Sequence, residues 1–126
     1  MTEREFYHYI NQEVRQQIEQ RGFTYQPHTT SLFWRQAEKH YQVFYINWDA
    51  SSQQQFYCDI GVSLPFLDVF YGENWMQFLP LAISVRLAEL KYGYDQWWKF
   101  QDLASLAVSV DDFLKTLDAY GLKWLG

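Results

Sequence analysis

Apolar residues near the start of the chain recur every four positions, which is the spacing of one face of a helix. This stripe consists of Phe6, Ile10, Val14 and Ile18. Thr2 and Glu5 precede it in the T-x-x-E pattern of a capping box, and Gly22 follows it where a left-handed C-terminal cap would lie. The pattern therefore predicts a helix over residues 3–21.

The middle of the chain alternates between apolar and polar residues with a period of two, which is typical of strands with one buried face. The clearest run extends from residue 56 to residue 64, and its apolar members are Phe56, Cys58, Ile60, Val62 and Leu64. Further strands are predicted over residues 23–26, 31–36 and 41–48. Polar turns of hairpin length, at residues 38–40 and 49–54, indicate that neighbouring strands are antiparallel.

Residues 66–80 show no clean period, and they contain the turn signal Gly72-Glu73-Asn74. We expect a long excursion there, and loops of that length in small domains are often functional. Residues 81–88 alternate as a strand would. A helical alternative stays open, with Ile83, Leu87 and Leu90 on one stripe and Gly93 as the stop, because short apolar runs fit both structures.

The last part of the chain predicts a second amphipathic helix. Ser109 is the expected N-cap, which places Asp111 and Asp112 in the first turn, near the positive end of the helix dipole. Gly121 is the expected end of the helix. The apolar stripe of this helix consists of Val110, Phe113, Leu114, Leu117 and Tyr120.

This order of elements predicts an α+β fold in a single domain that spans residues 1–126. We expect an antiparallel sheet of four to five strands, with an N-terminal and a C-terminal helix packed on one face. The chain has no internal repeat, low-complexity tract or linker that would indicate a second domain.

Composition adds expectations about the core and the compartment. The 126 residues are 48% hydrophobic, and their 26 aromatic rings are more than one small core should hold, so some Tyr and Trp are expected on the surface, where they favour interfaces. Cys58 is the single cysteine, so no intrachain disulfide can form. We expect no signal peptide, no membrane span and a cytoplasmic location.

The net charge of −5 falls entirely in the second part of the chain. Residues 1–47 hold five acidic and five basic residues, whereas residues 48–126 hold ten and five. This balance argues against nucleic-acid binding, which needs a basic surface, and is compatible with a basic protein partner. Solubility alone is the other explanation of the acidity.

Catalytic and metal-binding patterns are not evident in the sequence. His8, His28 and His40 carry no metal-ligand spacing, and Cys58 falls on the buried side of its strand. We therefore expect no catalytic residues, metal or cofactor. The candidate partner-binding residues are acidic or aromatic: Asp49, Asp59, Asp68, Tyr71, Glu73, Trp75 and Asp95. Of the neighbouring pair Trp97 and Trp98, one is expected to fill the core while Asp95 organises the turn.

Several segments together resemble a bacterial family of small domains of unknown function. They are Arg21-Gly22-Phe23, Leu32-Phe33-Trp34, Val43-Phe44-Tyr45-Ile46-Asn47, Asp59-Ile60-Gly61-Val62, Val85-Arg86-Leu87-Ala88-Glu89-Leu90, Asp95-Gln96-Trp97-Trp98 and Tyr120-Gly121-Leu122-Lys123-Trp124-Leu125. The resemblance implies an α+β fold and brings no catalytic residues. It also implies a link to polymorphic toxin systems, because some proteins of this kind are thought to be immunity proteins. Residues 65–80 look like an insertion relative to the family pattern.

Three hypotheses about function follow. The first is a non-catalytic immunity protein that neutralises a cognate bacterial toxin by direct binding, acting as a monomer or weak dimer. The second is an enzyme or small-ligand-binding protein with an aromatic pocket under residues 65–80. The third is a structural homo-oligomer that pairs through an exposed sheet edge.

Overall fold

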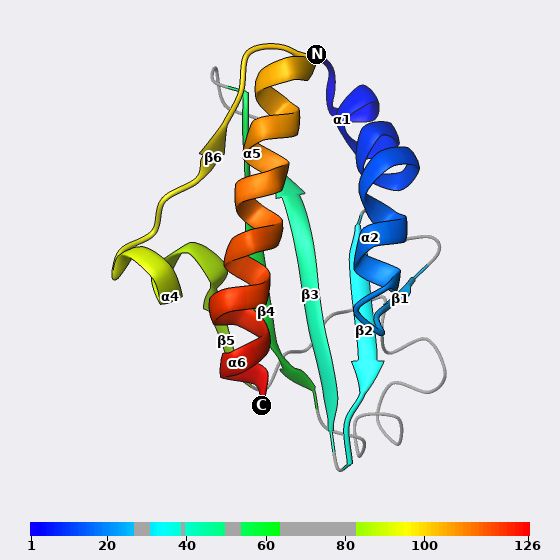
Figure 1. Cartoon of the computed structure of the whole chain (residues 1–126), viewed down its shortest axis with the longest axis vertical. Helices are drawn as coiled ribbons and strands as arrows, with labels where there is room; N and C mark the ends of the chain where they lie inside the picture. Colours follow the sequence, from blue (N-terminus) through cyan, green and yellow to red (C-terminus); the bar gives the residue numbers. More distant parts are fainter. Residues whose placement is uncertain (27–30, 39, 50–53, 64–82) are drawn as a thin grey trace.

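The computed structural model describes residues 1–26, 31–38, 40–49, 54–63 and 83–126. Over these residues, six strands form one antiparallel sheet, and the helices from the two ends of the chain lie side by side on one of its faces (Figure 1). The predicted α+β fold is confirmed. The described sheet has six strands because a two-residue strand, β6, also pairs with β4.

The N-terminal helix begins where the sequence predicts. Its segments are α1 (Glu3–Tyr9), the π-helical η1 (Ile10–Val14) and α2 (Arg15–Glu19). Thr2 caps it by accepting a hydrogen bond from the backbone N–H of Glu5 at 3.1 Å. The predicted apolar stripe is buried. Gly22 ends this region with a φ of +88°, which glycine adopts without strain.

The sheet has β4 near its centre. Its strands are β1 (Thr24–Tyr25), β2 (Leu32–Gln36), β3 (Tyr41–Trp48), β4 (Gln55–Ser63), β5 (Ile83–Arg86) and β6 (Trp98–Lys99). They follow the order β1-β2-β3-β4-β5, and β6 pairs with the first residues of β4. The predicted strands in the first half of the chain are confirmed to within one or two residues.

Both interpretations of residues 81–90 hold in part. Ile83–Arg86 form β5, with Arg86 paired opposite Asp59. The chain then turns into α4 (Leu87–Tyr92), which ends at Gly93 with a φ of +79°. The change from strand to helix carries Leu87 into the core, where it is fully buried. Residues 64–82, on which the predicted excursion falls, lie outside the described residues.

The predicted start of the last helix is wrong. The helix α5 (Leu103–Thr116) begins six residues before Ser109, because Asp102 and Ser105 form a reciprocal capping box. Ser109 lies inside the helix and donates a hydrogen bond to the carbonyl oxygen of Lys99. Asp111 and Asp112 therefore lie in the middle of α5, and not in the first turn.

The predicted end of this helix is also wrong, because the helical path continues through η3 (Leu117–Gly121) and α6 (Leu122–Leu125). Gly121 lies where the helix crosses α4 and β4. A Cβ at this position would lie 2.8 Å from Cδ1 of Leu87 and 3.1 Å from Cδ1 of Ile60. The glycine therefore serves close packing and does not end the helix.

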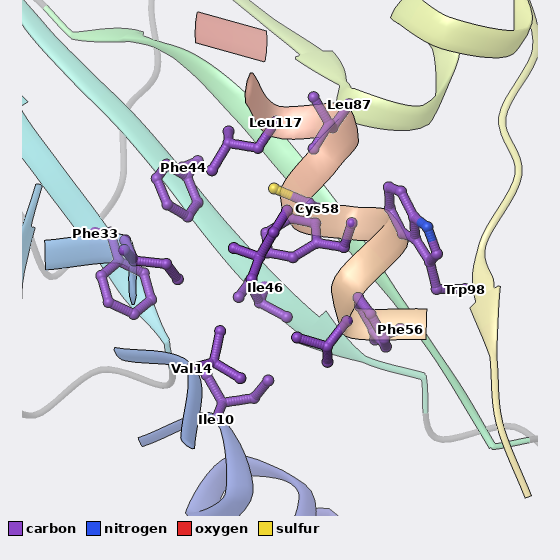
Figure 2. Close-up of a cluster of buried hydrophobic side chains, with 14 of the residues drawn as sticks. Ile10, Val14, Phe33, Phe44, Ile46, Phe56, Cys58, Leu87, Trp98 and Leu117 are labelled. Atoms are coloured by element: carbon purple, nitrogen blue, oxygen red, sulfur yellow. The ribbon is translucent and has the colours of Figure 1, made fainter. Parts of the chain in front are cut away.

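The main core fills the space between the sheet and the helices. In Figure 2, side chains from both helical regions meet those of β2, β3 and β4, with Cys58 near the centre and Trp98 at the β6 side. The ring of Phe6 stacks on that of Phe100 at 5.9 Å between centroids. Trp98 is 7% exposed, which confirms that one tryptophan of the pair fills the core.

Polar contacts join the two ends of the chain around this core. Arg21 donates to both carboxylate oxygens of Asp118, at 2.6 and 2.8 Å. Gln42 donates to the carbonyl oxygen of Leu125 at 3.0 Å. In the part of the chain that the structure describes, no helix has both the length and the apolar character needed to cross a bilayer.

The packing at Gly121 predicts a specific loss of stability. Gly121→Val should lower the free energy of unfolding by about 2 kcal/mol, because its methyl groups would overlap the buried side chains of Leu87 and Ile60. Ala119→Val, on the exposed side of the same segment, is the control and should cost only the difference in helix propensity, about 0.5 kcal/mol. Equilibrium denaturation measures both values. Equal losses for the two variants would contradict the packing explanation.

Candidate functional site

The candidate site lies on the face of β4 that points away from the helices. Alternation along β4 places Phe56, Cys58 and Ile60 in the core, so Tyr57 and Asp59 lie on the opposite face. The antiparallel register sets Asp59 between Tyr45 of β3 and Arg86 of β5. Two strands distant in sequence therefore contribute a tyrosine and an arginine to one carboxylate.

Asp59 is engaged from both sides. Arg86 Nε lies 2.9 Å from Asp59 Oδ1, and the Tyr45 hydroxyl donates a hydrogen bond to the same carboxylate. The side chains of Arg86 and Asp59 are 29% and 18% exposed. Burial raises the pKa of Asp59 and outweighs the opposite effects of Arg86 and Tyr45. Burial and the neighbouring carboxylate also raise the pKa of Tyr45 to about 12.

The guanidinium of Arg86 lies over the ring of Tyr57, with the ring of Trp97 nearby. Its central carbon lies 3.8 Å from the ring centroid of Tyr57 and 5.7 Å from that of Trp97, and the two rings lie 4.6 Å apart. Trp97 Nε1 donates to Asp95 Oδ2 at 2.9 Å. We call this group the Arg86 cluster. Its members are Tyr45, Tyr57, Asp59, Arg86, Asp95 and Trp97.

A cavity of about 690 Å³ lies beside the cluster, between residues 92–99 and α5. Asp95 and Trp97 border it as well, so the two features share a wall. Asp112 of α5 also borders the cavity and accepts hydrogen bonds from Trp98 Nε1 at 2.8 Å and Lys91 Nζ at 3.1 Å. Partial burial raises the pKa of Asp112, but these hydrogen bonds outweigh it, so the pKa is lowered. We call this space the α5 cavity.

The predicted partner-binding residues do not all meet. Asp59 and Asp95 come together in the Arg86 cluster. Asp49 lies elsewhere, at the end of β3, where it accepts a hydrogen bond from Gln55. The other four lie outside the described residues: Asp68, Tyr71, Glu73 and Trp75.

The sequence interpretation missed Arg86, Tyr57 and Tyr45 as members of the site. The alternation of their strands places all three on the outer face, which was a usable signal for Tyr57 and Tyr45. For Arg86 the alternation gave the face but not the neighbour, because the pairing of β4 with β5 joins segments that are far apart in the chain.

The described residues supply little for catalysis. His8 is exposed on α1, His40 is half-buried, and His28 lies outside the described residues. Among the described residues, no three His, Cys, Asp or Glu side chains gather in a way that could hold a metal ion. Cys58 is buried, and burial raises the pKa of its thiol well above the ordinary value, so the thiol is not poised as a nucleophile. The site presents rings and fixed charges that can bind a partner.

The chain belongs to the family described as "Domain of unknown function (DUF4304)", whose sequence model matches residues 9–126. The expected membership of a family of unknown function is therefore confirmed, and the family's description names neither a toxin nor an immunity protein. No curated protein and no solved structure matches the chain.

The ion pair in the cluster predicts a pH-dependent change in stability. Arg86→Met should lower the free energy of unfolding by about 2 kcal/mol at neutral pH, because Asp59 would stay partly buried without its cation. The pKa of Asp59, already raised, should rise further. The folded variant would then bind a proton more tightly than the unfolded chain, so its deficit should shrink as the pH falls from about 7 to about 5. Denaturation curves across this range measure the effect.

Arg15→Met is the matched control, because Arg15 pairs with Glu19 in an exposed i,i+4 bridge. We expect it to cost less than about 0.5 kcal/mol. An equal loss of stability by both variants at every pH would contradict the stabilising role of the Asp59–Arg86 ion pair.

The burial of Cys58 predicts that its thiol does not react in the folded protein. An aromatic disulfide reagent at mildly alkaline pH should modify Cys58 only after denaturant unfolds the chain, since both access and thiolate formation are suppressed. The reagent releases a coloured aromatic thiolate for each cysteine that it modifies, and the absorbance of this thiolate measures the reaction. Rapid stoichiometric modification of the native protein would contradict this placement.

Proposed function

We propose that this DUF4304 protein is a non-catalytic protein-binding protein, and that it neutralises a cognate bacterial toxin by direct binding, as an immunity protein. The Arg86 cluster would contact the toxin and block the toxin's active surface. The protein would catalyse no reaction itself. Such a protein would act in the cytoplasm, where the toxin would otherwise reach its target.

The composition and rigidity of the Arg86 cluster are the observation that carries the proposal. Tyrosine, tryptophan and arginine are the side chains that most often dominate the energy of protein interfaces. Here Tyr57, Arg86 and Trp97 contact one another and remain only half-buried. Asp59 holds the arginine in place through its ion pair, so less side-chain entropy would be lost when a partner binds.

Charge favours a basic partner. Asp95 is exposed at the border of the cluster, and the excess of acidic residues falls in the same part of the chain, residues 48–126. A basic partner would be steered towards such a surface and would associate faster at low salt. The choice of a toxin as this partner rests on the sequence resemblance.

The α5 cavity favours a second candidate, a small-ligand-binding protein. Its volume of about 690 Å³ is within the range of typical ligand sites, and Tyr92, Trp97 and Trp98 provide aromatic lining. A thermal-shift screen of small molecules separates the two candidates. A specific ligand that raises the melting temperature without affecting toxin binding would favour the second.

The proposal predicts that Trp97 is needed for binding. The immunity role implies a toxin gene directly beside the gene for this chain, so the test partner is the C-terminal domain of such a neighbouring protein, produced together with this chain. Trp97→Ala should weaken the complex by at least about 30-fold, since an interface tryptophan at a hot spot contributes about 2 kcal/mol or more. Calorimetric titration measures the dissociation constant, and survival of cells that express the domain measures neutralisation.

Trp124→Ala is the matched control, because Trp124 is 38% exposed and lies on α6, which packs on the face of the sheet opposite to the Arg86 cluster. It should leave both binding and survival unchanged. Absence of any complex between the two wild-type proteins would refute the immunity role. Equal weakening by both tryptophan variants would refute the assignment of the interface to the Arg86 cluster.

A further inference from the structure

Two large, well-exposed side chains lie at the rim of the α5 cavity. Tyr94 and Val108 border it from opposite sides, and they are 61% and 70% exposed. Large apolar side chains with this much exposure occur at few described positions of this protein, and two of them flank one hollow. These two side chains can cover the apolar part of a group that enters the cavity.

Inside this rim the lining combines aromatic and acidic side chains with Lys99 and neutral polar residues. The rings of Tyr92, Trp97 and Trp98 border the cavity, together with the carboxylates of Asp95 and Asp112. Aromatic faces and a carboxylate in one hollow are the combination that attracts an organic cation, through the ring quadrupoles and through charge.

Of the two carboxylates at the cavity, Asp112 has an ion-pair partner and Asp95 has none among the described residues. Lys91 pairs with Asp112 at 3.1 Å, and Lys99 also borders the cavity. Among the described residues, no basic group lies within ion-pairing distance of Asp95, whose contact there is the hydrogen bond from Trp97. Asp95 therefore remains available to a cation that arrives from outside.

We propose that the α5 cavity receives one arginine side chain of the protein partner, which lies against the aromatic lining and pairs with Asp95. This inference rests on the proposed protein-binding function and names the group recognised. Arginine fits better than lysine, because its planar guanidinium can stack on a ring while it donates two parallel hydrogen bonds to a carboxylate. The apolar rim would cover the methylene groups of the same side chain.

The test uses a short peptide and requires no partner. The capped tripeptide acetyl-Gly-Arg-Gly-amide is titrated into the ¹⁵N-labelled full chain, and the indole N–H signal of Trp97 is followed, assigned by its absence from Trp97→Phe. We expect a saturable shift with a dissociation constant in the millimolar range, as suits a single side chain. The same peptide with citrulline in place of arginine keeps the shape but lacks the charge, and it should bind at least about fivefold more weakly.

Asp95→Asn should weaken binding of the arginine peptide by a similar factor, because the amide can still accept the hydrogen bond from Trp97 but carries no charge. Asp111→Asn is the matched control, since Asp111 is exposed on α5 and pairs with Lys115. It should leave the titration unchanged.

Three outcomes would overturn the inference: no shift of the Trp97 signal at about 10 mM peptide, equal binding of the citrulline peptide, or full binding by Asp95→Asn. These outcomes are separable from failure of the proposed function. If the toxin domain binds wild-type protein and Asp95→Asn equally well, protein binding stands and the role of the cavity falls.

Discussion

The period-two alternation of β4 is the constraint on which both the core and the Arg86 cluster depend. Phe56, Cys58 and Ile60 are buried against the helices, so Tyr57 and Asp59 must occupy the other face. A slip of one residue in the pairing of β4 would send a carboxylate into the core and remove Asp59 from Arg86. The cost of burying a charge among aromatic rings therefore fixes the register and, with it, the site.

The two surface features are parts of one continuous region, because Asp95 and Trp97 belong to both. In Figure 1, the segment that carries them runs from α4 along one side of the sheet to β6, which lies beside α5. Trp98 fixes the position of this segment, because its ring is buried in the core and its Nε1 donates a hydrogen bond to Asp112. A buried tryptophan thus places its exposed neighbour between a charged cluster and a cavity.

Sequence alone predicted those elements whose local pattern was unambiguous. β3 and β4 follow from alternation, and the first helix follows from its stripe and cap. The last helix was misplaced because Ser109 and Asp112 imitate a cap, whereas Asp102 and Ser105 form the actual one. Gly121 was taken for the end of the helix because glycine commonly marks a helix end. A glycine that is required for close packing looks the same in the sequence, so the two roles could not be distinguished.

The candidate site was only partly predictable for a different reason. Asp59 and Asp95 could be singled out as acidic residues, but Arg86, which pairs with Asp59, is placed by the pairing of β4 with β5. Such long-range pairing leaves no local signature in the sequence. The role of Trp97 similarly depends on contacts with Tyr57 and Arg86 that only the folded chain creates.

Hydrogen exchange of the protein with and without the proposed partner, a candidate toxin domain, tests the central claim most directly, because it maps the covered surface without any substitution. If the Arg86 cluster is the docking surface, amide exchange in residues 93–98 should slow markedly in the complex, with little change along α1 and α6. Slowed exchange confined to those helices, with residues 93–98 unaffected, would contradict the account.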